Sequence, residues 1–70
     1  MKIEFINKEQ DYQNDQTRYW FDVDGVEYCI QDEIGGLSLL DHTGNEVLDC
    51  NDFDGIKAKL MPEYEKHIND

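Results

Sequence analysis

The sequence has 70 residues, of which 17 are Asp or Glu and 6 are Lys or Arg, so its formal net charge is −11. A chain of this length forms one domain, residues 1–70, and must build its core from nearly all of its large apolar residues. The strong negative charge disfavours direct binding to nucleic acid or to an anionic membrane, since both are negative.

The N-terminal part predicts one strand followed by a polar segment. Residues 2–6 alternate, with Ile3 and Phe5 on one face of the strand. Residues 7–16 (NKEQDYQNDQ) are polar apart from Tyr12, and we expect a surface connection there.

Residues 19–30, YWFDVDGVEYCI, predict a β-hairpin closed by a two-residue turn at Asp24-Gly25. Because side chains alternate along a strand, such a turn sets the register and separates two faces. The apolar face is expected to carry Tyr19, Phe21 and Val23 opposite Ile30, Tyr28 and Val26. The other face is expected to carry Arg18, Trp20 and Asp22 opposite Gln31, Cys29 and Glu27.

The segments after the hairpin predict a meander. The glycine pair in residues 32–36 permits a tight turn, and residues 37–40 form the next strand with Leu37 and Leu39 inward. Residues 41–45 form another turn, and residues 46–50 return as a short strand. Short connections of this kind favour an antiparallel sheet of four to five strands.

A C-terminal helix over residues 53–68 is predicted by apolar side chains at Phe53, Ile56, Leu60, Tyr64 and Ile68. Asn51 or Asp52 can cap its start. Pro62 removes a backbone donor, so we expect a helix that is kinked or split at this residue. The predicted fold class is therefore α+β, with the helix packed on one face of the sheet.

No metal or cofactor is predicted. Residues 22–25 and 50–55 look like fragments of calcium loops, but they lack the end ligands of such loops. Cys29 and Cys50 match no metal-binding spacing, and we expect small buried thiols. Under oxidising conditions, a bridge between them would be the only intramolecular disulfide.

No enzyme is predicted either. His42 on a turn and His67 near the end of the chain are expected to be solvated, and no phosphate-binding glycine loop or nucleophile elbow is present. The lack of an apolar stretch after Met1 and of any long apolar run predicts a cytoplasmic protein.

Charge distribution is the main functional clue. Between Tyr19 and Ile56 there is no Lys or Arg, while the carboxylates are Asp22, Asp24, Glu27, Asp32, Glu33, Asp41, Glu46, Asp49, Asp52 and Asp54. Such an array is either a solvated surface or a phosphate-like surface for a basic groove. Trp20 either packs with Cys29 into a minor core or forms an exposed aromatic anchor, a residue type common at binding hot spots.

The organisation resembles the small acidic inhibitors encoded by phages and mobile elements, including anti-CRISPR proteins and other DNA mimics. The similarity rests on the chain length, the YWFDVDGVEYCI hairpin, the short meander and the closing helix from DFDG onward. It implies an inhibitor that occupies the nucleic-acid groove of a host nuclease or surveillance complex.

Two functions follow from these observations. The first is an acidic binding protein that inhibits a nucleic-acid-handling enzyme by presenting phosphate-like carboxylates. The alternative is a general protein–protein interaction module, such as an immunity or regulatory protein. The expected partner contacts are Asp22, Asp24 and Glu27 on the hairpin with Trp20 as an anchor, Asp32 and Glu33 beside the glycine pair, and Asp49, Asp52 and Asp54 before the helix.

Overall fold

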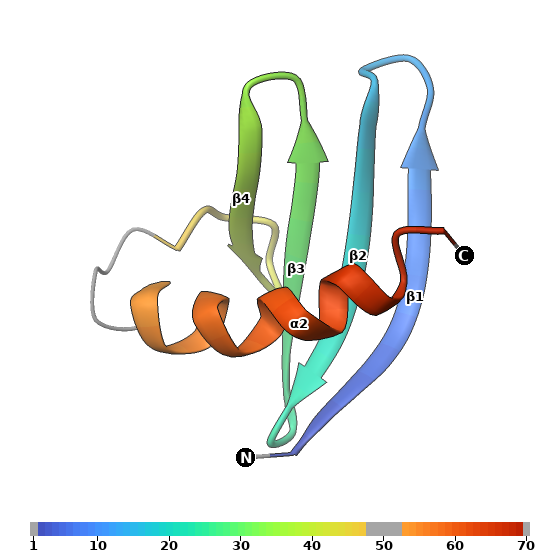
Figure 1. Cartoon of the computed structure of the whole chain (residues 1–70). Helices are drawn as coiled ribbons and strands as arrows, with labels where there is room; N and C mark the ends of the chain where they lie inside the picture. Colours follow the sequence, from blue (N-terminus) through green and yellow to red (C-terminus); the bar gives the residue numbers. More distant parts are fainter. Residues whose placement is uncertain (1, 48–52, 70) are drawn as a thin grey trace.

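The computed structural model describes residues 2–47 and 53–69, with the backbone alone for residues 53 and 54. It has two layers: a four-stranded antiparallel sheet in the order β1-β2-β3-β4, and a helix, α2, across one face of that sheet (Figure 1). The elements are β1 (Ile3–Asp11), β2 (Gln16–Val23), β3 (Val26–Glu33), β4 (Gly36–Asp41), a π-helical turn η1 (Phe53–Lys57) and α2 (Ala58–Lys66). The α+β class and the antiparallel meander are confirmed. We call the sheet face under α2 the helix face and the opposite one the open face.

The central hairpin has the predicted register. Tyr19 is opposite Ile30, and Trp20 is opposite Cys29. Asp24 and Gly25 have positive φ angles of 52° and 88°, as a primed two-residue turn requires. Such a turn matches the twist of the strands, and the predicted separation of the two faces is confirmed on β2.

The carboxylates of this turn hold its backbone. The Gly25 N–H donates to Asp22 Oδ1 over 2.7 Å, and the Lys2 N–H donates to Asp24 Oδ1 over 2.8 Å. The hairpin tip is thereby joined to the start of β1.

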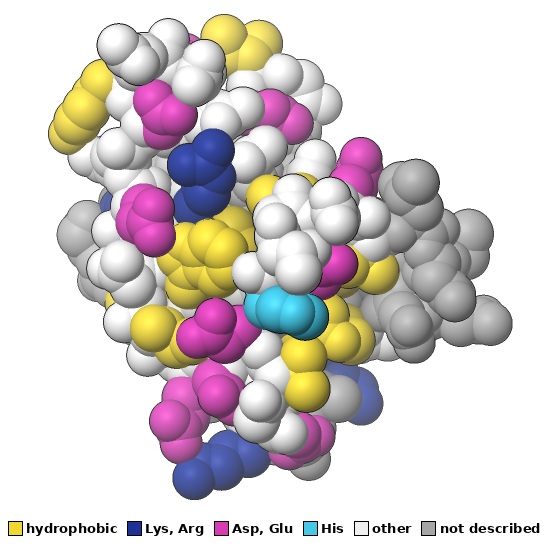
Figure 2. Space-filling view, turned by 180° about the vertical axis from the view of Figure 1, so that it is seen from behind, with side chains coloured by type: hydrophobic (Ala, Val, Ile, Leu, Met, Phe, Trp, Pro, Cys, Tyr) yellow, Lys and Arg dark blue, Asp and Glu magenta, His cyan; other side chains and the backbone are white. Residues whose placement is uncertain are grey.

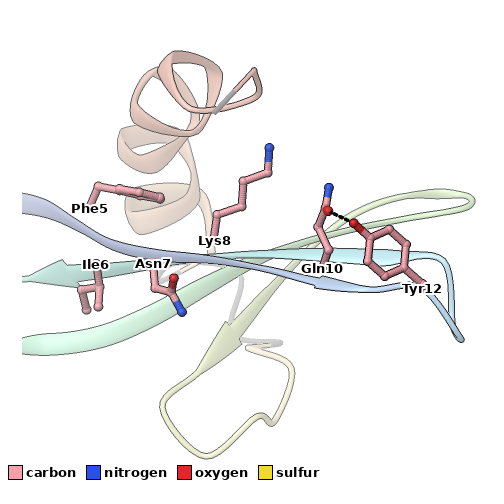
Figure 3. A pocket seen from close by; sticks show the side chains of 6 residues that line it. All are labelled: Phe5, Ile6, Asn7, Lys8, Gln10 and Tyr12. Atoms are coloured by element: carbon pink, nitrogen blue, oxygen red, sulfur yellow. Dashed lines mark hydrogen bonds between the residues drawn. The ribbon is translucent and has the colours of Figure 1, made fainter.

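β1 is longer than predicted, and the expected surface connection over residues 7–16 is wrong. The strand continues to Asp11, which is opposite Gln16, and only residues 12–15 form the turn to β2. A bulge between Phe5 and Asn7 adds a residue, so Phe5 and Lys8 point to the helix face while Ile6 and Asn7 point to the open face (Figure 3). The bulge interrupts the alternation, and the polar second half of the strand resembles a loop in sequence.

The predicted fifth strand is not confirmed. Within the described residues, this region has an isolated bridge between Leu40 and Glu46 and a hydrogen bond from the Val47 N–H to the Leu39 carbonyl (2.8 Å). Residues 48–50 of the predicted strand lie outside the described part of the chain. The preceding loop is held by Asp41 Oδ1, which accepts bonds from the backbone N–H groups of Thr43 and Asn45.

The helical segment changes type between Lys57 and Ala58, and α2 continues through Pro62. The predicted break at Pro62 is therefore not confirmed. α2 ends at Lys66, so Ile68 lies beyond it and remains exposed instead of completing the apolar stripe. In the described part of the chain, neither helical segment has the length and apolar character needed to cross a membrane.

The core lies between α2 and the helix face. Its fully buried side chains are Phe21, Ile30, Leu39 and Leu60, joined by Tyr19, Val23 and Tyr64. Ile3, Phe5, Leu37 and Tyr28 pack around this cluster. Val26 was expected in the core, but 47% of it is exposed because α2 crosses the strands above the β2–β3 turn (Figure 1).

Candidate binding surface on the open face of the sheet

The open face carries an apolar patch bordered by carboxylates and by one basic side chain. Figure 2 shows this side of the molecule, with hydrophobic side chains near the centre, acidic side chains around them and a basic side chain adjoining the centre. The strands place these residues in rows, since residues opposite each other in register share a face. The rows can therefore be described in turn, starting from the β2–β3 turn.

The first row consists of Glu4, Asp22 and Glu27, which are opposite one another on β1, β2 and β3. We call it the carboxylate row. Directly opposed side chains have Cβ atoms about 4.5–5.5 Å apart, and like charges at this spacing are destabilising. Lys2 Nζ lies 2.9 Å from Glu4 Oε1, but both side chains are mostly exposed, so this ion pair offsets little of the repulsion.

The second row places Trp20 between Asn7 and Cys29, with Leu40 beyond Cys29. Cys29 is fully buried, and burial raises the pKa of its thiol to about 11. Trp20 is partly buried, and its Nε1 is buried with no hydrogen-bond acceptor among the described residues. Cys29 thus belongs to a minor core, whereas Trp20 retains an exposed part that does not include Nε1.

An open depression of about 280 Å³ lies over Trp20. We call it the Trp20 depression; its lining residues are Ile6, Asn7, Glu9, Trp20, Glu27 and His42. On β1, Glu9 lies two residues after Asn7, which is opposite Trp20. On β3, Glu27 lies two residues before Cys29, which is opposite Trp20 on the other side. The two carboxylates therefore flank the indole diagonally from either side.

Arg18 occupies the third row but is held by amide groups. Its Nε donates to Gln31 Oε1 (3.1 Å), and one terminal nitrogen donates to Gln16 Oε1 (3.0 Å). Among the described residues, the ion pairs are Lys2–Glu4 and Lys66–Glu63. Glu9 and Glu27 thus have no ion-pair partner in that part of the chain.

The other predicted contact residues are dispersed. Asp24 is at the hairpin tip, while Asp32 and Glu33 are at the opposite end of the sheet. Glu33 Oε2 accepts a bond from Gln16 Nε2 over 2.9 Å. Asp49 and Asp52 lie outside the described residues, and only the backbone of Asp54 is described.

Asp32 faces α2 rather than solvent alone. Its Oδ2 accepts a hydrogen bond from the Tyr64 hydroxyl over 3.1 Å. Burial, together with this bond, raises the pKa of Tyr64 to about 12. Asp32 therefore contributes to docking of the helix, and it is not part of the surface around Trp20.

Of two further hollows, one lies away from this surface and the other shares Ile6 and Asn7 with the Trp20 depression. One, of about 270 Å³, is bounded by Asp15, Thr17, Asp32, Glu33 and Ile34 at the end of the sheet opposite the hairpin tip. The other is lined by Phe5, Ile6, Asn7, Lys8, Gln10 and Tyr12, whose side chains point to both sides of β1 (Figure 3). The second hollow therefore straddles the sheet edge instead of forming a pocket on one face.

Sequence reasoning missed Glu4, Glu9 and His42 as neighbours of the hairpin surface. Alternation with Ile3 and Phe5 puts Glu4 on the other face of its strand, but its position beside Asp22 depends on the β1–β2 register. Glu9 was assigned to a loop. His67, expected in solvent, instead stacks on Phe5 with ring centroids 3.8 Å apart.

The described residues contain no group of three or more His, Cys, Asp or Glu side chains arranged to hold a metal ion. Residues 22–25 form the hairpin turn, and residues 50–55 fall partly outside the described chain. The open face is therefore best described as a carboxylate-rich surface with one aromatic residue. No protein-family model, curated protein or solved structure matches this chain.

Proposed function

We propose that this protein is an acidic binding protein that inhibits a nucleic-acid-handling enzyme or complex by occupying its basic groove. The carboxylate row beside Trp20 is the observation that carries the proposal. Its three side chains stand on hydrogen-bonded strands, so little backbone entropy is lost when a partner binds them.

The spacing of these carboxylates suits a surface of Lys and Arg side chains. Neighbours across strands are about 5 Å apart, and neighbours along one strand are about 6–7 Å apart. Repulsion within the row is relieved when cations of a partner approach. The net charge of −11 would accelerate encounter with such a partner and repel nucleic acid from the same groove.

In this proposal the protein acts by occupancy, without catalysis, metal or cofactor. It works in the cytoplasm, where nucleic-acid-handling enzymes are found, and binds neither nucleic acid nor membrane. This mode of action is that of the small acidic phage inhibitors, such as anti-CRISPR proteins and DNA mimics, which the chain resembles.

A second candidate is a general protein–protein module, such as an immunity or regulatory protein. It is favoured by the internal use of several carboxylates: Asp22 and Asp24 hold the turn, Asp32 binds Tyr64, and Glu33 binds Gln16. In that case the acidity mainly serves folding and solubility, and the exposed part of Trp20 supplies the contact.

Affinity capture from the source cells, followed by kinetics with the purified partner, tests the proposal. A phosphate mimic should lose association rate steeply as salt rises, and DNA or RNA should displace it from the partner. Binding that is insensitive to salt and to nucleic acid would support the interaction module instead.

Charge reversal of two carboxylates locates the surface. Glu4→Lys with Glu27→Lys should abolish partner binding, whereas Glu63→Lys with Glu65→Lys on α2 makes the same change in net charge and should weaken it far less. Asp22 and Asp24 are left intact because they hold the turn. Equal losses from the two pairs would show that net charge alone governs binding.

A further inference from the structure

We infer that the Trp20 depression receives an arginine side chain of the partner, whose guanidinium stacks on the indole between Glu9 and Glu27. This inference rests on the proposed function in that it requires a basic partner. It adds which side chain of the partner binds at the Trp20 depression, which the overall acidity of the protein does not specify.

The exposed part of Trp20 determines what kind of group can bind there. Nε1 is buried, whereas the residue as a whole is only partly buried. The depression therefore meets the ring carbons and not the N–H donor, so a hydrogen-bond acceptor would find no donor on the indole. A π surface of this kind attracts cations over its face and also permits stacking of planar groups.

Charge around the indole decides between these two classes of ligand. Glu9 and Glu27 both line the depression, and they flank Trp20 on β1 and β3. A nucleobase stacked there would bring its phosphate close to two carboxylates, whereas a cation would be attracted by both. The site is therefore complementary to a positive side chain.

The chain has one cation on the same face, Arg18, two residues before Trp20 on β2 and opposite Glu9 on β1. Its guanidinium is engaged by Gln31 and Gln16, on the side away from the carboxylate row. Among the described residues, Lys8 makes a cation–π contact on the helix face, with its Nζ 5.3 Å from the centroid of the Tyr19 ring. The depression is thus open to a cation from another molecule.

Arginine fits better than lysine for geometric reasons. Its guanidinium is planar, so it can lie flat on the indole while its edge donates hydrogen bonds to a carboxylate. The Asn7 side chain, which also lines the depression, offers a further acceptor oxygen. A lysine ammonium would gain the charge attraction but neither the stacking nor the paired hydrogen bonds.

Fluorescence can test this directly because Trp20 is the single tryptophan of the chain. The purified protein is titrated with a short capped arginine peptide and with a lysine peptide of the same length and charge. The arginine peptide should produce a saturable change in Trp20 emission and bind about threefold more tightly or better. Equal affinities, or binding without a change in emission, would overturn the inference.

Matched variants locate the binding. Glu9→Gln with Glu27→Gln should weaken arginine-peptide binding about tenfold, since charged hydrogen bonds on both sides of the guanidinium are lost. Glu63→Gln with Glu65→Gln removes the same charge from α2 and should change the affinity by less than about twofold. If both pairs of substitutions weakened binding equally, net charge alone would explain the affinity, and the Trp20 depression would not be the arginine site.

A third variant isolates the stacking term. Trp20→Leu, followed by calorimetry and checked for folding by circular dichroism, should bind both peptides with similar affinity, because the preference for arginine depends on the indole. Retention of that preference would overturn the inference. A captured basic partner whose binding leaves Trp20 emission unchanged would overturn this contact while leaving the proposed function standing. Selective arginine binding without any nucleic-acid-handling partner would support the Trp20 contact and overturn the proposed function.

Discussion

Truncation of Phe21 to alanine tests the assignment of the core. Phe21 is fully buried on the helix face and packs edge-on against Phe5, with ring centroids 5.6 Å apart. Loss of a buried phenylalanine costs about 3–5 kcal/mol, through lost transfer free energy and the cavity that remains. At roughly 0.05–0.15 kcal/mol per residue, a domain of this size has a total stability of only about 3.5–10 kcal/mol. Phe21→Ala should therefore remove a large share of the free energy of unfolding.

Urea unfolding followed by Trp20 fluorescence and circular dichroism measures this loss. Phe21→Leu keeps most of the side-chain volume and should lie between the wild type and Phe21→Ala. Tyr12→Ala is the matched control, since 85% of Tyr12 is exposed, and it should change stability by no more than about 0.5 kcal/mol. If Phe21→Ala unfolded at the same urea concentration as Tyr12→Ala, the packing of α2 over β2 would be wrong.

Three further predictions concern ionisable groups. Because the pKa of Tyr64 is raised to about 12, the unfolded chain releases this proton first, so the free energy of unfolding should fall as pH rises from about 10 through about 12. Tyr64→Phe should lose part of this alkaline decline, and an identical pH profile would contradict the prediction. In a Cys50→Ser variant, Cys29 should react with a thiol reagent at about pH 8 only after denaturant is added. The reason is that its thiol is buried and the pKa of that thiol is raised to about 11. Fast labelling of the folded variant would disprove this prediction. Glu27→Gln should stabilise the fold by about 0.2–1 kcal/mol at low salt by relieving repulsion in the carboxylate row, and the gain should vanish near about 1 M salt. Glu65→Gln is its control, and an equal gain there would exclude the cross-strand explanation.

The sequence alone determined the features that depend on local chemistry. The Asp24-Gly25 turn allows a primed hairpin, and a two-residue turn permits one register, so the pairs across β2 and β3 followed directly. The helical spacing of Leu60 and Tyr64 likewise predicted which side of α2 is buried. Each of these signals is complete within a dozen residues of the chain.

Tertiary structure decided the features that depend on a neighbouring element. The second half of β1 is polar and its alternation is broken by the bulge at residues 5–7, so pairing with β2 makes it a strand where local sequence indicates a loop. Val26 has the correct phase for the core but lies beyond the reach of α2, and burial depends on what covers a residue as well as on its phase.

The candidate site shows the same division. Asp22, Glu27 and Trp20 could be placed on one face from the hairpin alone. Their neighbours Glu4 and Glu9 could not, because a bulge shifts every later residue of the strand to the other face, and a one-residue error in β1 would have moved Glu9 away from Trp20. The register across a two-residue turn follows from the sequence, whereas the bulge in β1 and the register beyond it are set by the packed sheet.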